Sequence, residues 1–166
     1  GIPIFAVSVA LMHDGEPIAS AVYNPVTDSL FSAEKDIGAW WNGTPMHVSE
    51  NTADVAMISF GQSSRANDRD AMKRLFVASD AYVKRARHLG SAALELAYCA
   101  RGGTEGYINL GTKLWDYVAG QLLVREAGGQ VTDLLGASCG YDQPYFVASN
   151  KVIHDTLMAL VEDNKK

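Results

Sequence analysis

The sequence predicts an α/β fold, a layered α+β sandwich in which an antiparallel sheet is followed by a mixed sheet with flanking helices. Residues 1–50 carry short alternating segments between turn residues, and none of these segments has a helical period. From residue 55 onward, apolar segments of strand length alternate with helical patterns, as in layered α/β proteins. The chain has 166 residues, of which 48% are hydrophobic and 20% charged, so it can bury one compact core.

The first strand is predicted over residues 5–11, where bulky and small side chains alternate. The bulky residues are Phe5, Val7, Val9 and Leu11, and the small ones are Ala6, Ser8 and Ala10. Successive side chains of a strand point to opposite faces of its sheet. We therefore expect one bulky face and one face that is small enough for close packing against a helix.

Hairpin turns connect this strand to the next ones. The turns are predicted at His13–Glu16 and Asn24–Asp28, and short connections of this kind join antiparallel strands. The predicted strands are Ile18–Tyr23, Leu30–Ala33 and Ala39–Trp41. Asn42-Gly43-Thr44 fits a glycosylation sequon and also a hairpin turn, and we favour the turn because Asn-Gly is a preferred hairpin dipeptide.

Beyond Asn51 the pattern changes to alternating strands and helices. The expected strands are Val55–Phe60, Val83–Leu89, Gly106–Leu110, Gln130–Asp133 and Tyr145–Ser149. The expected helices are Asp68–Ser79, with Met72, Leu75 and Phe76 inward, then Ser91–Arg101, Trp115–Ala127 and one after Asn150. The change near residues 51–54 marks a lobe boundary between 1–52 and 53–166, which need not be an independent domain break.

The sheet of the first lobe lacks a covering element in its own part of the sequence. No helix is predicted within residues 1–50. We therefore expect an apolar face of this sheet to be exposed, which favours aggregation or dimerisation.

The helix that begins at Trp115 carries the most informative residue, Asp116. Apolar residues recur at helical spacing, which predicts an amphipathic helix with one face on the core. They are Trp115, Val118, Ala119, Leu122 and Leu123. A carboxylate in the first turn is favoured by the helix dipole, and an ionised, rigid carboxylate is a suitable ligand for a hard divalent cation. From spacing alone, we favour the interpretation of Asp116 as a favourable first-turn charge.

Charge and cysteine usage exclude some classes of partner. The net charge is −5 with no basic block, which argues against a nucleic-acid or anionic-membrane surface. Cys99 and Cys139 do not form a Cys-x-x-Cys pattern, so we expect a reducing compartment, the cytoplasm, and no metal cluster.

Three segments resemble one family in the order in which that family carries them. Trp115–Gly120 followed by Glu126–Gly129 resembles the C-terminal signature of the inositol monophosphatase family. Gly90–Ala93 resembles that family's substrate-contacting turn, and Gly1–Leu11 resembles the strand after its catalytic loop. The resemblance implies a sugar-phosphatase fold and a Mg²⁺-dependent, lithium-sensitive phosphate monoester hydrolase. It also implies a homodimer, and direct attack of water without a covalent phospho-enzyme.

One departure from the family concerns its acidic loop. The family's Asp-Pro-Ile-Asp-Gly-Thr loop, which precedes this strand and binds most of the metal and phosphate, does not occur in the 166 residues. We therefore expect this chain to be a C-terminal portion, with residues 1–52 as the remnant of an N-terminal lobe, and to be inactive by itself. The alternative is a catalytically silent fragment or a binding module.

The resemblance also implies roles for individual residues. Asp116 would be a catalytic residue, a Mg²⁺ ligand and a contact of the substrate's leaving group. Gly90, Ser91 and Ala92 would line the pocket for the alcohol half of the substrate, although Ser91 is also a good helix N-cap. Lys113 is interpreted as a solvated loop charge.

Asn109 would shape substrate specificity. It stands where the family often carries a Glu that accepts hydrogen bonds from inositol hydroxyls, and an amide has one acceptor oxygen and no charge. The exchange argues against inositol monophosphate itself and leaves the phosphatase chemistry unchanged. The expected substrate is an inositol phosphate or a related polyol or sugar phosphate. The alternatives hydrolysed by relatives of this fold are histidinol phosphate, fructose 1,6-bisphosphate and phosphoadenosine phosphate.

Overall fold

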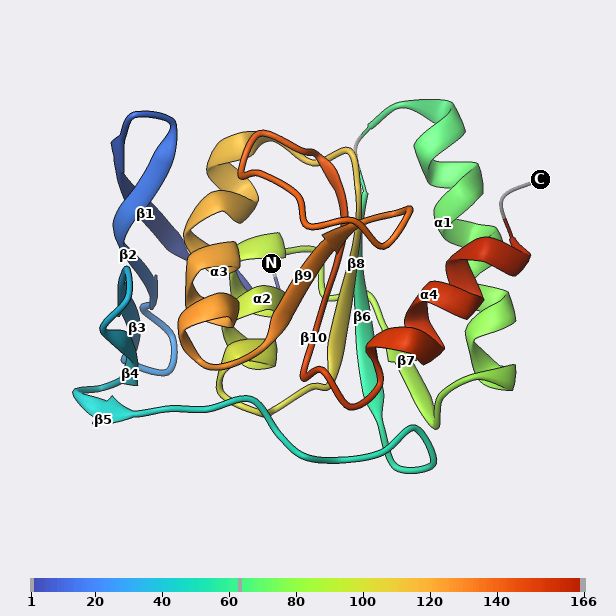
Figure 1. Ribbon diagram of the computed structural model, residues 1–166, viewed down its shortest axis with the longest axis horizontal. Coiled ribbons are helices and arrows are strands. Elements are labelled where there is room, and N and C mark those ends of the chain that lie inside the picture. Colours follow the sequence, from blue (N-terminus) through green and yellow to red (C-terminus); the bar gives the residue numbers. More distant parts are fainter. Residues whose placement is uncertain (1, 63, 165–166) are drawn as a thin grey trace.

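The fold consists of four layers, which alternate between sheet and helices (Figure 1). The computed structural model describes residues 2–62 and 64–164, so Gly1, the first residue of the resembled strand, lies outside the described residues. An antiparallel sheet forms one outer layer, and helices α2 (Ala92–Ala100) and α3 (Leu114–Glu126) pack against it. The second sheet follows, and helices α1 (Ala66–Ala78) and α4 (His154–Asp163) cover its far side.

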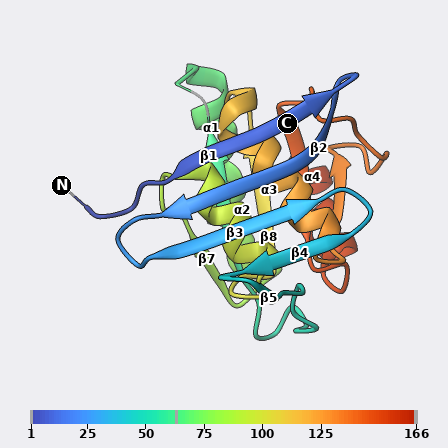
Figure 2. The same cartoon turned by 90° about the vertical axis from the view of Figure 1, so that its left-hand side faces the viewer.

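The first sheet is a meander of five antiparallel strands in chain order (Figure 2). Its strands are β1 (Val7–His13), β2 (Glu16–Asn24), β3 (Ser29–Glu34), β4 (Gly38–Trp41) and β5 (Thr44–Pro45). Asn42 and Gly43 both have positive φ, 48° and 78°, as a two-residue hairpin turn requires. The predicted turn at Asn42-Gly43 is therefore confirmed.

The second sheet is mixed, as predicted. Its strands are β6 (Met57–Gln62), β7 (Arg85–Arg87), β8 (Gly106–Leu110), β9 (Gln130–Asp133) and β10 (Tyr145–Ser149), and they lie in the order β7-β6-β8-β10-β9. β6 pairs in parallel with β7 and β8, whereas β10 pairs antiparallel with β8 and β9. A short 3-10 helix, η1 (Ser79–Ala81), follows α1. The mixed α/β fold class is confirmed.

Two hydrophobic clusters lie on opposite sides of the second sheet. One contains residues of the first sheet together with α2 and α3, and the other lies between the second sheet and α1 and α4. Met72 and Leu75 of α1 are buried, as predicted. The inward prediction for Phe76 is only partly right, since its ring contacts Phe60 at a centroid distance of 5.6 Å but the residue stays 37% exposed.

Helix α3 differs from the amphipathic helix that was predicted. Its residues 117–124 are all buried, because the first sheet covers one side and α2 and the second sheet cover the other. Trp115 was expected on the core face but is 68% exposed. The first turn of α3 therefore faces a cavity and solvent, whereas the rest of the helix is a central core element.

The faces of the first sheet also need a correction. The small residues Ala6 and Ala10 pack against the cluster around α2 and α3, so helices from later in the chain cover the small face. The apolar face that remains open is the bulky one, where Val7, Val9 and Leu11 are each more than half exposed. The expected exposed apolar face is present, on the opposite side of the sheet.

The segment between β5 and β6, which contains the predicted lobe boundary, is tied to the second sheet by the buried Glu105. Ser49 Oγ and Asn51 Nδ2 donate to Glu105 Oε1 at 3.0 and 2.9 Å, and the Met57 backbone N–H donates to Oε2 at 2.6 Å. Asn150 Nδ2 donates to Ser49 Oγ at 3.1 Å. The division into 1–52 and 53–166 stays a prediction, and Lys165 and Lys166 lie outside the described residues.

Candidate active site

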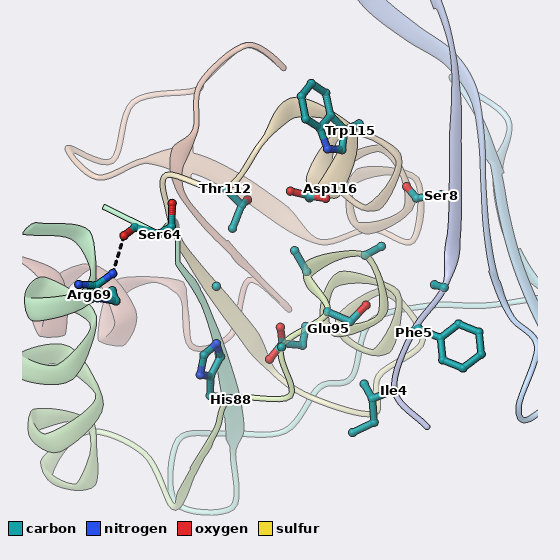
Figure 3. A pocket seen from close by; sticks show the side chains of 16 residues that line it. Ile4, Phe5, Ser8, Ser64, Arg69, His88, Glu95, Thr112, Trp115 and Asp116 are labelled. Atoms are coloured by element: carbon teal, nitrogen blue, oxygen red, sulfur yellow. Dashed lines mark hydrogen bonds between the residues drawn. The ribbon is translucent and has the colours of Figure 1, made fainter. Parts of the chain in front are cut away.

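A cavity of about 690 Å³ opens where the N-termini of α2 and α3 face the residues at the start of β1 (Figure 3). Gly90, Ser91, Ala92 and Asp116 all line it. Residues 24 or more positions apart are therefore brought together, as the resemblance implied. A volume of 690 Å³ is in the range of small-molecule sites, roughly 300–1,000 Å³.

Asp116 occupies the third position of α3. The helix begins at Leu114, one residue before the predicted start, and Asp116 lies in its first turn as predicted. Asp116 Oδ2 accepts a hydrogen bond from the Lys113 backbone N–H at 3.1 Å, which fixes one carboxylate oxygen. The half-buried carboxylate faces the cavity at the helix N-terminus, where the helix dipole favours negative charge.

The turn Leu89-Gly90-Ser91 connects β7 to α2 and forms another part of the wall. Gly90 has φ +83°, a left-handed conformation that residues with a Cβ rarely adopt. Ser91 is the N-cap of α2, as predicted, but its side chain makes no capping hydrogen bond. Instead, the Glu95 carboxyl accepts a hydrogen bond from the Leu89 backbone N–H at 2.8 Å.

Glu95 is a wall residue that the sequence reasoning missed. It is 1% exposed, and burial raises the pKa of its carboxyl to about 8, against which the backbone hydrogen bonds of Leu89 and Ser91 act. Its Oε2 has no hydrogen-bond partner among the described residues. The available signal was a single Glu within the otherwise apolar pattern of Ala92–Ala100.

Asn109 lies behind the cavity wall and is fully buried. Its Oδ1 accepts hydrogen bonds from Tyr107 Oη at 2.8 Å and Thr112 Oγ1 at 2.7 Å, and its Nδ2 donates to the Pro144 carbonyl at 2.7 Å. Thr112 lines the cavity, whereas Asn109 is not among the lining residues. Asn109 is therefore held behind the wall, next to Thr112, and its role in substrate specificity stays a prediction.

Gly61 brings β6 close to the same cluster. A Cβ at this position would lie 1.8 Å from the Tyr107 hydroxyl and 2.9 Å from Asn109 Oδ1. Only glycine therefore allows the strand to approach Tyr107 and Asn109 at this wall of the cavity.

The remaining polar lining comes from elements far apart in the sequence. Ser8 lies on β1, His88 precedes the Gly90 turn, and Ser64 and Arg69 lie at the start of α1. Arg69 Nη1 donates to the Ser64 carbonyl at 2.5 Å and adds a positive charge to the lining (Figure 3). No local pattern marks these residues, because only the folded chain brings them together. Lys113 is exposed and is not among the lining residues.

The described residues supply few candidate metal ligands. Among residues 2–62 and 64–164, no group of three or more His, Cys, Asp or Glu side chains could hold a metal ion. Asp116 is the carboxylate of the lining that combines partial exposure with a helix N-terminus, while Glu95 is buried and has a raised pKa. Mg²⁺ accepts one or two carboxylates when waters and substrate phosphate complete its shell, so this donor set fits a partial Mg²⁺ site.

The comparisons with known proteins agree with this geometry. A family model described as the inositol monophosphatase family matches residues 1–166. This chain belongs to the inositol monophosphatase family. It is similar to an inositol-1-monophosphatase of Mesorhizobium japonicum, with 37% identity over 98% of this chain and 62% of that protein. It is also similar to a Nus factor SuhB of Xylella fastidiosa, with 38% identity over 97% of this chain and 62% of that protein.

A solved structure shows the same fold. The extragenic suppressor protein suhB of Bartonella henselae superposes with a TM-score of 0.90 and 36% identity, over 97% of this chain and 62% of that chain. The predicted family and fold are therefore confirmed. The chain spans about three fifths of the length of the curated relatives that it matches.

Proposed function

We propose that this chain supplies Asp116 and the alcohol-binding turn Gly90–Ala92 to the active site of a Mg²⁺-dependent phosphate monoester hydrolase. The observation that carries the proposal is the convergence of Asp116 with Gly90, Ser91 and Ala92 on one cavity of ligand size. Family membership supports the hydrolase and phosphatase assignment. The activity proposed is that of the complete gene product that contains these residues.

Asp116 has two proposed tasks in this reaction. As a carboxylate at the cavity wall, it would hold Mg²⁺ together with water and substrate phosphate, and it would orient the leaving-group side of the substrate. Bound Mg²⁺ polarises the phosphoryl group, lowers the pKa of bound water and stabilises charge on the leaving oxygen. The Lys113 hydrogen bond to Oδ2 keeps the carboxylate oriented before substrate enters. We propose direct attack of water, inhibition by lithium and no covalent phospho-enzyme.

The proposed substrate is an inositol phosphate or a related polyol or sugar phosphate. Gly90, Ser91 and Ala92 would line the side that receives the alcohol half, and Arg69 adds a positive charge suited to an anion. Asn109 is an uncharged amide and is buried behind Thr112, so this position offers no carboxylate to inositol hydroxyls. Histidinol phosphate, fructose 1,6-bisphosphate and phosphoadenosine phosphate remain the alternative substrates within the same fold.

We also propose a cytoplasmic homodimer that binds neither nucleic acid nor membrane. The net charge of −5 and the two free, buried cysteines support a reducing compartment and a small-molecule substrate. Among the described helices, none is long and apolar enough to cross a membrane. The exposed bulky face of the first sheet supports self-association.

Phosphate release with a substrate panel, with and without Mg²⁺, tests the proposal on the complete gene product. Asp116→Asn should lower kcat/KM at least 100-fold, about 2.7 kcal/mol, because a neutral amide is a poor Mg²⁺ ligand. Asp155→Asn is the matched control, since Asp155 is also a first-turn Asp but lies exposed on α4. Absence of Mg²⁺-dependent release from the wild type would favour the silent fragment or binding module.

The same panel tests the proposal for specificity. Because Asn109 offers no charge and no direct contact, we expect another polyol or sugar phosphate to be hydrolysed at least as well as inositol 1-phosphate. If inositol 1-phosphate is clearly the preferred substrate, the exchange at Asn109 does not control specificity.

A further inference from the structure

The carboxyl of Glu95 lies in the cavity wall at the start of α2, where the Leu89–Ser91 turn meets the helix (Figure 3). Glu95 is 1% exposed, which is unusual for a glutamate without an ion-pair partner. Burying a carboxyl in this way is costly, so its retention calls for a specific contact. The contact that Glu95 makes is with the backbone of the turn.

Glu95 reaches back along the helix to hold this turn. Its Oε1 accepts the Leu89 N–H at 2.8 Å, and the nearby Ser91 backbone also acts to lower the pKa of the carboxyl. Gly90, between them, is in the left-handed conformation at φ +83°. The Glu95 side chain therefore binds the backbone directly before the glycine that turns the chain.

The side chain at the N-cap of α2 does not hold the turn. Serine at an N-cap commonly satisfies a free backbone N–H of the first turn with its own hydroxyl. Ser91 occupies the N-cap but makes no such hydrogen bond, although it lines the cavity. Because Glu95 binds the turn instead, the Ser91 hydroxyl is not committed to capping its own helix.

Glu95 lines two cavities, and its second oxygen is buried. Oε2 is buried without a partner among the described residues, and Glu95 lines both the 690 Å³ cavity and a second one of about 290 Å³ below α2. Ser59 Oγ and Thr104 Oγ1, whose residues also line the second cavity, are likewise buried without partners. The hydrogen bond from the Leu89 N–H is therefore the described polar contact between the Glu95 side chain and the turn.

We infer that Glu95 is a positioning residue, which holds the Leu89–Ser91 turn so that Gly90 and Ser91 face the alcohol half of the substrate. This inference rests on the proposed function for the identity of the ligand. The clamp itself, from Glu95 to the turn, is a property of the fold and can be tested separately.

Two substitutions separate the clamp from simple packing. Glu95→Gln keeps an acceptor oxygen for the Leu89 N–H, whereas Glu95→Leu fills the space without an acceptor. In the complete gene product, Glu95→Leu should raise KM for a polyol phosphate about tenfold and change kcat less, as expected from loss of a hydrogen bond worth up to ~1.5 kcal/mol. Glu95→Gln should restore KM to within about threefold of the wild type. Glu50→Leu, at an exposed glutamate outside the cavity lining, is the control.

Inhibition by inorganic phosphate distinguishes loss of the clamp from a general packing defect, because a packing defect would also weaken phosphate binding. The turn is assigned to the alcohol half, so Glu95→Leu should leave the inhibition constant of phosphate within about twofold. An equal loss of phosphate and substrate affinity would overturn the inference, as would a Gln variant as impaired as the Leu variant.

Amide hydrogen exchange tests the clamp without any enzymatic activity. Exchange at Leu89 and Ser91 should become faster in Glu95→Leu and stay near the wild-type rate in Glu95→Gln and Glu50→Leu. Faster exchange together with no phosphate release from the wild type would support the clamp and reject the proposed function. Unchanged exchange in Glu95→Leu would overturn the inference whatever the activity.

Discussion

Two carboxyl side chains of the cavity wall have opposite environments. Asp116 is half-buried at a helix N-terminus and accepts a hydrogen bond from Lys113 N–H, which suits an ionised metal ligand. Glu95 is buried, with one oxygen unpartnered, and its pKa is raised to about 8. Residues of the same chemical class thus have different proposed roles, Asp116 toward metal and Glu95 toward the backbone of the turn.

The raised pKa of Glu95 predicts how stability depends on pH. The folded protein keeps the proton up to about pH 8, whereas the unfolded chain loses it near 4.5. The contribution of Glu95 to the free energy of unfolding is therefore fully present below about pH 4.5 and is lost as the pH rises through about 8, by at most ~1.4 kcal/mol per pH unit. Denaturant unfolding at several pH values should show this slope in the wild type.

Glu95→Gln is the control for that slope, because an amide does not titrate. The difference in free energy of unfolding between wild type and Glu95→Gln should shift in favour of the Gln variant as the pH rises. Parallel pH dependences of the two proteins would mean that the folded carboxyl titrates at an ordinary pKa.

The local interactions that set the strands were readable from sequence, but the site was readable only in part. Asp116 and the Gly90–Ala92 turn were predicted as site residues through the resemblance of their segments to the family, whereas their local patterns indicated only a first-turn carboxylate and a helix N-cap. Glu95 was missed because its effect depends on burial and on the folded position of Leu89 N–H. Asn109 was placed in contact with substrate, and its burial behind Thr112 depends on how β8 packs against β6.

At the scale of elements, α3 illustrates the same limit. Its helical period was recognised, but its burial on both sides follows from the first sheet covering a helix that is more than sixty residues later in the sequence. Sequence periodicity predicts one apolar face of a helix well, but it does not predict that a helix will be buried on both sides between two sheets. The hairpins of the first sheet were predicted correctly because their turn residues specify them locally.

The contact of α3 with α2 depends on Gly120. A Cβ at this position would lie 2.5 Å from Leu96 Cβ, so Gly120→Ala forces the helices apart. We expect a loss of about 1–3 kcal/mol in the free energy of unfolding, reduced by the better helix propensity of Ala, about 1 kcal/mol. Thermal or denaturant unfolding measures this loss.

A second substitution tests the cause. In a double-mutant cycle, Leu96→Gly removes the Leu96 Cβ that the new methyl group would meet, together with Cγ and Cδ1, so the two losses should be less than additive. Strict additivity would show that the close approach of the two helices is not what makes Gly120→Ala destabilising.

For the whole molecule, the open bulky face of the first sheet predicts self-association. Val7, Val9 and Leu11 are each more than half exposed on neighbouring positions of one face, and contiguous apolar patches of this kind mark interaction surfaces. The 166-residue chain should therefore form dimers or larger species as its concentration rises. Sedimentation velocity over a concentration series measures this.

Val9→Lys should shift the distribution toward monomer, because a charge in the centre of the patch would have to be desolvated. The control is Val77→Lys, at a 77% exposed valine on α1, outside the first sheet. A wild-type chain that stays monomeric throughout the series would contradict the prediction, as would equal effects of the two substitutions.

The central claim is that Asp116 and the Gly90–Ala92 turn share one metal- and phosphate-binding cavity. Paramagnetic Mn²⁺, as a probe for the Mg²⁺ site, tests it most directly by NMR line broadening in the complete gene product with inorganic phosphate present. We predict that the amide signals of Gly90, Ser91 and Asp116 broaden, that those of the first turn of α4 do not, and that Asp116→Asn raises the Mn²⁺ concentration needed for the broadening. Broadening that bypasses Asp116 and the turn, or that survives Asp116→Asn unchanged, would contradict the account.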